Sequence, residues 1–346
     1  MFDWFRTIFR GAAGREREML KTRGRGRVLR YIDILGPWAG CIVFAIVVAS
    51  QTATFITPVN VTNVLVDATA YVLIAIGMTF VMTGAGIDLS VGSIVGLCGA
   101  IMTVLVKHTA ISPILAMVVC LALGALLGLV NGLIITKLKI PDFIGTLATM
   151  TAFRGITLVI IGGRVLFGFP ETLIYLGQAR LGGIMPVCII AAIVVVIVAH
   201  FLYQRTKFGR YTVAIGGNRA AATYAGVPVD KYKIYTYVFS GFLTALATVM
   251  LIGRLDSYHG TLGMGMELHT IAAVIIGGTA LYGGIGRVWG SLAGAILLAM
   301  VINGMVHLGL QYFWQQVAVG VVIILAVMLY TMTGLRKSRG VGGVGG

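Results

Sequence analysis

Charged residues are scarce in this chain: they make up 11% of its 346 residues, whereas a soluble domain averages about 25%. Its apolar runs have few polar interruptions, and many extend for about 20 residues, the length that crosses a bilayer core as a helix. Hydrophobic residues supply 58% of the chain, and the mean hydropathy is +0.99. These properties exclude an ordinary soluble domain and predict a polytopic membrane protein of the all-α class.

Three further absences narrow the class. Segments of about ten residues with alternating apolar and polar positions, which a membrane β-barrel requires, are not visible. The four cysteines fall within apolar runs and show no C-x-x-C or metal-binding spacing, so we interpret them as small core residues. Carboxylates and histidines are almost absent from the apolar runs, which argues against an ion-coupled secondary transporter and against an intramembrane enzyme.

Ten apolar stretches are predicted to span the membrane. The third and eighth are short and rich in glycine, so we expect broken or partly re-entrant helices, which are tolerated where the backbone is buried in protein or lines a cavity. The predicted spans lie near residues 34–52, 64–82, 91–106, 112–135, 143–162, 185–203, 233–252, 270–282, 288–308 and 314–333.

The net charge of +15 comes from basic residues that gather in alternate connecting segments. With the N-terminus in the cytoplasm, 21 of the 26 Lys and Arg residues fall in inside segments, four fall in outside segments, and Arg154 lies within a span. The positive-inside rule therefore predicts an even number of spans with both termini in the cytoplasm. Because this distribution orients a membrane protein, it gives no reason to expect a nucleic-acid partner.

The two ends of the chain differ from the predicted membrane domain, residues 34–335. Residues 1–33 form a basic arm with an amphipathic start, for which binding to anionic lipid and a solvated tail are equally supported. Residues 336–346 form a glycine-rich tail of low complexity. Both ends are predicted to be cytoplasmic.

The longest predicted cytoplasmic loop, residues 204–232, contains the sequence GGNRAAATYAGV. Asn218 is a good N-cap, Arg219–Ala225 is long enough for about two helical turns, and Gly226 and Pro228 end them. A helix this short is marginal in water and needs a partner surface. Its small side chains permit close approach, so we predict a docking helix.

Six stretches beyond residue 59 have distinctive sequences. They are NVTNVL (60–65), GMTFVMTGAGIDLSVGSIVGL (77–97), GLVNGLII (128–135), PDFIGTLATMTAFRG (141–155), FGRYTVAIGGNRAAATYAGV (208–227) and ELHTIAAVIIGGTALYGGIGRVWGSLAGA (267–295). Together and in this order, they resemble the permease subunits of bacterial ABC importers for sugars, in the ribose, galactose and xylose branch. Each stretch alone would be a weak signal, whereas their combination is highly specific.

The resemblance implies a type II ABC importer-like fold in the bacterial inner membrane, where this chain would be half of a dimeric pore for a monosaccharide. The expected partners are a second permease subunit (a homodimer is favoured over a heterodimer), two copies of a separate ATPase subunit and a periplasmic sugar-binding protein. The chain has no G-x-x-x-x-G-K-[ST] phosphate loop, so ATP would be bound by the ATPase subunit. We therefore expect neither catalysis nor a cofactor in this chain.

The ATPase would dock on the helix predicted in the 204–232 loop. The residues expected at that contact are Gly216, Gly217, Asn218, Arg219, Ala221, Ala222 and Gly226. On the outside, the loop at 253–269 carries Asp256 and Glu267. We expect these two carboxylates to contact the binding protein, against the alternative of a solvated loop.

Polar residues within or beside the spans are candidates for the substrate pathway: Asp88, Ser90, Asn131, Arg154 and Asn303. For Asp88 we favour bonding of backbone amides near the start of the third span over a role in substrate passage. For Arg154 we favour hydrogen bonds to backbone carbonyls or to a neighbouring subunit over a role in substrate passage. For the two asparagines, bonding across helices and lining the pore are equally supported.

Other solutes compete with a monosaccharide. A permease of the same superfamily could carry a polyol such as inositol, a nucleoside, a furanone signal or a branched-chain amino acid, and the residues of one chain do not separate these substrates. An ion-coupled secondary transporter is a more remote alternative, because the docking helix has no role in it.

Overall fold

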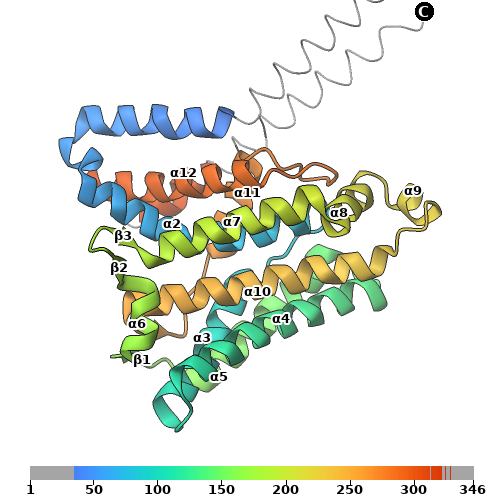
Figure 1. The fold of residues 1–346 in the computed structure, drawn as a ribbon, viewed down its shortest axis with the longest axis horizontal. Helices are drawn as coiled ribbons and strands as arrows, with labels where there is room; N and C mark the ends of the chain where they lie inside the picture. The colour runs from blue at the N-terminus through green and yellow to red at the C-terminus, as the bar shows by residue number, and fades with distance from the viewer. Residues whose placement is uncertain (1–34, 312, 322–323, 325–327, 329–346) are drawn as a thin grey trace, which may run out of the picture.

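The computed structural model describes residues 35–311, 313–321, 324 and 328, so the N-terminal arm, the C-terminal tail and half of the tenth predicted span lie outside the described residues. The described part is a bundle of helices with a few very short strands, which confirms the all-α polytopic class (Figure 1). Within it, seven helices are long and apolar enough to cross a membrane, and Leu35–Gln51 and Met266–Ile276 are shorter apolar helices. The total of ten spans stays a prediction.

The elements labelled in Figure 1 follow Leu35–Gln51 in chain order. They are η1 (Ala53–Ile56), α2 (Pro58–Thr83), α3 (Val91–His108), α4 (Pro113–Lys137), α5 (Asp142–Ile161), β1 (Val165–Phe167), α6 (Glu171–Gln178), β2 (Arg180–Leu181), β3 (Met185–Pro186), α7 (Val187–Arg205), α8 (Lys207–Gly217), α9 (Arg219–Tyr224), α10 (Val229–Leu255), β4 (Ser257–His259), α11 (Met266–Ile276) and α12 (Val288–His307).

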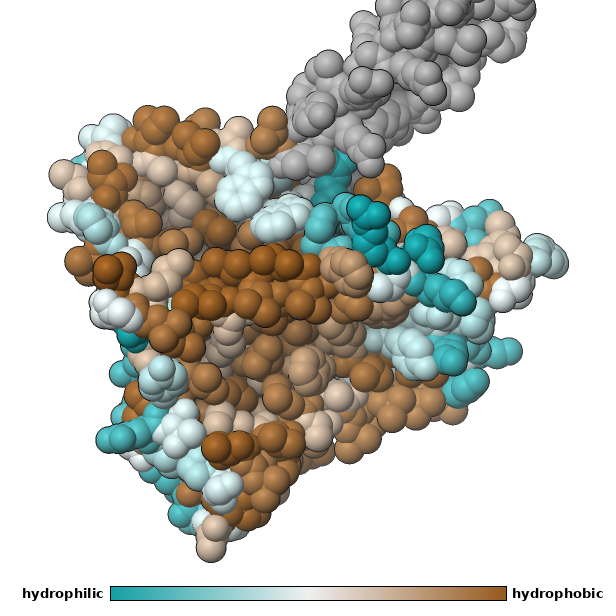
Figure 2. Space-filling model, viewed as in Figure 1, coloured by the Kyte–Doolittle hydropathy of each residue, from teal (hydrophilic) through white to brown (hydrophobic). Residues whose placement is uncertain are grey.

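The centre of the bundle is α2, which packs against α7, α10, α11 and α12 and is buried along most of its length. The more peripheral α4 and α7 leave apolar side chains such as Leu126 and Ile197 exposed. Figure 2 shows a broad hydrophobic surface across the middle of the molecule. A surface of this kind is stable in hydrocarbon, because lipid tails are as apolar as the side chains that face them.

Glycines allow a close and extensive contact between α4 and α10. A Cβ atom added at Gly124 or Gly128 would collide with the backbone of Gly241 or Tyr237, respectively. Small residues at a membrane helix interface let two backbones approach, and the gain is van der Waals packing rather than hydrophobic burial. This contact fixes α10 beside α4 and so positions the polar residues of both helices.

The two ends of the bundle carry different elements. Figure 1 places α8, α9, the start of α10 and the end of α4 at one end, and α6 with the short strands at the other. In the same view, hydrophilic surface gathers at both ends and is sparse between them (Figure 2). The strands pair as two small antiparallel ribbons, β1 with β4 and β2 with β3.

Two non-helical segments interrupt the bundle. The eighth predicted span is broken as expected, because α11 ends at Ile276, whereas the third is one continuous helix, Val91–His108, so the expectation of a break within it was wrong. Residues 84–90 separate α2 from α3, and residues 277–287 separate α11, a helix of only 11 residues, from α12. The Gly284 amide of the second segment donates to the Thr83 carbonyl at 2.9 Å, and Thr83 is the last residue of α2, directly before the first segment. Both therefore lie beside the end of α2.

Candidate functional site

The predicted docking helix is present as α9. Asn218 has extended backbone angles, and its side-chain oxygen accepts a hydrogen bond from the Ala221 amide at 2.9 Å, so it is the N-cap. Gly226 follows the helix with a φ of +77°, a conformation that favours glycine. The sequence placed the end of this helix one residue late, at Ala225, which is the C-cap.

One face of α9 packs against its neighbours, and the other is exposed. Ala222 is buried and forms a small apolar cluster with Ile215 of α8 and Val229 of α10. Ala221 is exposed, and Tyr224 is 92% exposed at the end of the helix. An exposed surface of small residues beside a large aromatic side chain suits close contact with another protein.

The sequence missed α8, which precedes α9 in the 204–232 loop. Its buried residues are Gly209, Thr212 and Ile215, a spacing of three residues that places them on one face of a helix. That spacing was a usable signal for the helix. Two residues further on, Gly217 faces open space at the end of α8.

Three of the predicted pathway residues form one buried cluster. The Asn131 amide of α4 donates to the Ser90 hydroxyl at 2.7 Å, and that hydroxyl donates to Asp88 Oδ1 at 2.6 Å. The Ser90 amide also donates to Asp88 Oδ1, at 3.0 Å, so Asp88 bonds a backbone amide just before α3. All three side chains are buried. The cluster ties the 84–90 segment to α4.

Arg154, in α5, holds three backbone carbonyls together. Its guanidinium donates to the carbonyls of Gly92, Gly260 and Leu262 at 2.9 to 3.0 Å. The first carbonyl belongs to α3 and the other two to the turn between β4 and α11. The planar guanidinium holds its N–H donors in fixed positions, which suits hydrogen bonding to several carbonyls at once. These contacts agree with the interpretation that Arg154 bonds carbonyls.

Asn303 does not join that cluster. It lies in α12 and exchanges amide hydrogen bonds with Asn60 of α2, at 2.9 Å in one direction and 3.1 Å in the other. Asn60 also donates to the Phe55 carbonyl at 2.8 Å. Of the two interpretations of Asn303, these contacts agree with hydrogen bonding across helices.

The two predicted outside carboxylates have different surroundings. Asp256 follows α10 in a left-handed conformation with a φ of +47°, and its Oδ1 accepts a hydrogen bond from the Phe169 amide at 2.6 Å. Glu267 is in the first turn of α11, where its Oε1 accepts from the Gly265 amide at 3.2 Å. Of these two carboxylates, only Glu267 lines a large cavity at the end of the bundle that carries α6 and the short strands.

That cavity has a volume of about 710 Å³ and lies between α2, α10 and α11. Its polar wall contains Asp67 and Arg254, which form an ion pair, together with Glu267 and His259. Sequence reasoning missed Asp67, although a carboxylate inside an apolar run is itself a signal. The described residues include no group of three or more His, Cys, Asp or Glu side chains that could hold a metal ion.

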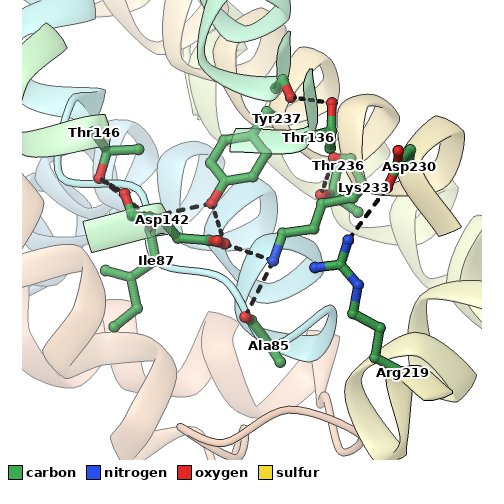
Figure 3. A network of polar contacts seen from close by, with 11 residues as sticks. Ala85, Ile87, Thr136, Asp142, Thr146, Arg219, Asp230, Lys233, Thr236 and Tyr237 are labelled. Carbon is green, nitrogen blue, oxygen red and sulfur yellow. Dashed lines mark hydrogen bonds and ion pairs between the residues drawn. The ribbon is translucent and has the colours of Figure 1, made fainter. Parts of the chain in front are cut away.

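A second polar cluster, at the α9 end, was also missed by sequence reasoning. It joins Asp142, the first residue of α5, to Lys233 and Tyr237 of α10 (Figure 3). Lys233 Nζ lies 2.7 Å from Asp142 Oδ2, and the lysine side chain is only 6% exposed. Because the two partners come from distant parts of the chain, local sequence gave no sign of the pair.

Comparison with known proteins gives consistent matches. A family described as branched-chain amino acid transport system / permease component matches residues 60–332. The Ribose import permease protein RbsC of Bacillus subtilis (strain 168) is 41% identical over 297 residues, which cover 85% of this chain and 92% of that protein.

Two further relatives carry other names. The D-allose transport system permease protein AlsC of Escherichia coli (strain K12) is 36% identical, over 83% of this chain and 88% of its own length. The Galactose/methyl galactoside import permease protein MglC of the same strain is 32% identical, over 89% of this chain and 97% of its own length. No solved structure matches the chain.

Proposed function

We propose that this chain, which belongs to the permease component family of branched-chain amino acid transport systems, is the membrane-spanning subunit of an ABC importer for a monosaccharide. The observation that carries the proposal is similarity over nearly the whole length of relatives named as ribose, allose and galactose permeases. The chain would be a non-catalytic subunit of the bacterial inner membrane, powered by ATP hydrolysis on a partner.

We place the ATPase at α9 and the neighbouring residues Gly216–Gly226. The exposed face of α9 supports this assignment, as does its attachment to α8 and α10 through Ala222. A second permease subunit, most simply another copy, would complete the pore, and two ATPase subunits would bind the pair. Both termini would then lie on the ATPase side, which agrees with the positive charge of the 204–232 loop.

At the opposite end, a periplasmic binding protein would deliver the sugar to the cavity beside Glu267. Carboxylates and a guanidinium bind vicinal hydroxyls through several hydrogen bonds, and a cavity of this volume lies within the range of small-molecule sites. The inner cluster of Asp88, Ser90 and Asn131 stays a candidate for later steps of passage. For Arg154 and Asn303, the observed contacts favour holding the helices in place.

A different solute is the main competing proposal, since the family description itself names branched-chain amino acids. Inositol, a nucleoside and a furanone signal belong to the same set of alternatives. The experiment is co-purification of the chain from its native membrane in mild detergent, with mass spectrometry of the accompanying proteins. The proposal expects an ATPase and a binding protein, whose thermal stabilisation by a sugar panel then identifies the substrate. A chain that reproducibly purifies alone and transports without ATP would overturn it.

A further inference from the structure

An ion pair between a buried lysine and a partly buried aspartate links α10 to the start of α5. Lys233 Nζ lies 2.7 Å from Asp142 Oδ2, and the Tyr237 hydroxyl, one helical turn further along α10, lies 2.8 Å from the same oxygen (Figure 3). Lys233 and Tyr237 are buried. An ion pair with a buried lysine is seldom the most stable choice for a core, because the ammonium group loses most of its hydration. Its presence therefore invites an explanation other than stability.

The same side chains hold the segment between α2 and α3. Lys233 Nζ donates to the Ala85 carbonyl at 3.3 Å, and the Tyr237 hydroxyl also lies 3.3 Å from the Ile87 carbonyl. Thr146 of α5 donates to that Ile87 carbonyl at 3.3 Å (Figure 3). Residues 84–90 are not helical, so their carbonyls need partners, and α10 and α5 supply them.

The start of α10 is also bound to α9. Arg219, the first residue of α9, forms an ion pair with Asp230 at 3.2 Å, and Val229 packs with Ala222. Asp230 and Lys233 are three residues apart, so they lie on adjacent turns of one face of α10. A displacement of α9 would therefore move the turn that carries Lys233.

At its far end, the 84–90 segment carries Asp88 and Ser90. The Ser90 hydroxyl accepts from the Asn131 amide in the core of the bundle and donates to Asp88. A continuous set of contacts thus runs from α9, through the first turns of α10, to this buried polar cluster. Chains of packed and hydrogen-bonded side chains between rigid elements are the physical means by which distant sites are coupled.

We propose that Lys233, Asp142 and Tyr237 are positioning residues that transmit the movement of the docking helix α9 into the 84–90 segment during transport. This inference rests on the proposed function, in which an ATPase docks at α9. The three residues contact neither ATP nor substrate in this account. Their role is to make the 84–90 segment follow α10 when the ATPase moves it.

The test measures ATP hydrolysis and solute uptake together in proteoliposomes that hold the complete complex. The principal variant is Asp142→Asn with Lys233→Met, which removes both charges and leaves neither one unpaired. We expect normal recovery of the ATPase with this variant, ATP hydrolysis near the wild-type rate, and uptake per ATP reduced by about tenfold or more. Wild-type uptake per ATP in the assembled double variant would overturn the proposal.

Two further variants make the test specific. Tyr237→Phe removes one hydroxyl and no charge, so it is expected to fold and to lower uptake per ATP by a smaller factor; it decides the question if the double variant does not assemble. Thr236→Val is the matched control, since Thr236 is buried on the same turn but bonds only the Lys233 carbonyl, within its own helix. Equal coupling in Tyr237→Phe and Thr236→Val would contradict the proposal.

Failure of the proposed function would give a different experimental result from failure of the positioning proposal. In that case the wild-type chain itself would purify without an ATPase, or its ATPase would have no effect on uptake. The positioning proposal alone fails when the wild type is coupled and the variants are coupled equally well.

Discussion

Gly216, in the last turn of α8, packs directly against the backbone of Thr83 at the end of α2. A Cβ atom added at Gly216 would collide with the Thr83 carbonyl oxygen and would lie 2.5 Å from the Gly284 amide nitrogen. The next residue, Gly217, has no atom within 4 Å of the same added position. The segment proposed to bind the ATPase therefore packs against the core of the bundle at Gly216 but not at Gly217.

The two glycines predict opposite results for the same substitution. Gly216→Ala should push α8 away from α2, destabilise the protein by about 1–3 kcal/mol and weaken its recovery with the ATPase. Gly217→Ala, the matched control for packing, should leave the stability unchanged, because a methyl group added there meets no neighbouring atom. Thermal unfolding in detergent and co-purification measure the two effects. Equal behaviour of the two variants would show that the close packing of Gly216 has no consequence.

Ala221 tests the docking surface itself. Ala221→Glu places a charge on the exposed face of α9, where an exposed substitution changes stability by only about 0.5 kcal/mol. We expect an unchanged melting temperature with loss of ATPase recovery or of ATP-driven uptake. Ala110→Glu is the control, because Ala110 is also exposed but lies between α3 and α4. Normal ATPase assembly and uptake in Ala221→Glu would remove α9 from the contact.

Arg154 is predicted to contribute mainly to stability rather than to substrate passage. Arg154→Met removes the donor shared by the carbonyls of Gly92, Gly260 and Leu262. The Gly92 carbonyl belongs to the α3 hydrogen-bond ladder, whereas those of Gly260 and Leu262 lie in a turn, where each buried group left unsatisfied costs about 1–3 kcal/mol. Thermal unfolding of the purified complex should show a marked loss, with Arg154→Lys in between because an ammonium lacks the planar fork. A fully stable Arg154→Met that has lost uptake would instead assign Arg154 to substrate passage.

The pair of Asn60 and Asn303 can be separated from a pore role by a double-mutant cycle. Either asparagine changed to leucine leaves the other amide unpaired, so the double variant should lose less stability than the sum of the single variants, by about 1 kcal/mol. Unfolding measures this difference, and the concentration dependence of uptake should not change. Additive stability losses with altered substrate affinity would support a pore lining by Asn303.

Local features of this chain were predictable because local physics determines them. Helices cover most of the apolar stretches predicted up to residue 308, with residues 277–282 as the main exception, since a helix satisfies its backbone hydrogen bonds within one segment of chain. The Asn218 cap and the turn at Gly226 were predictable for the same reason, because each depends on a few consecutive residues. The break between α2 and α3 followed from glycines in the segment itself.

Contacts between distant residues were not predictable in this way. Tyr237 and Asp142 are 95 residues apart, and Asn60 and Asn303 are 243 apart, so no short window of sequence contains either pair. The extent to which a polar residue is buried was equally unpredictable from the sequence. The sequence identified Asp88 and Ser90 as candidates, but only the fold brings Asn131 to them from α4.

The central claim is that this chain moves a monosaccharide only when a separate ATPase drives it. The most direct measurement is uptake of labelled ribose, allose and galactose, with leucine, inositol and a nucleoside as comparisons, into proteoliposomes that hold the co-purified complex and its binding protein. We predict saturable uptake of a monosaccharide that requires both ATP and the binding protein. Accumulation by the chain alone, without ATP and in response to an ion gradient, would contradict this account.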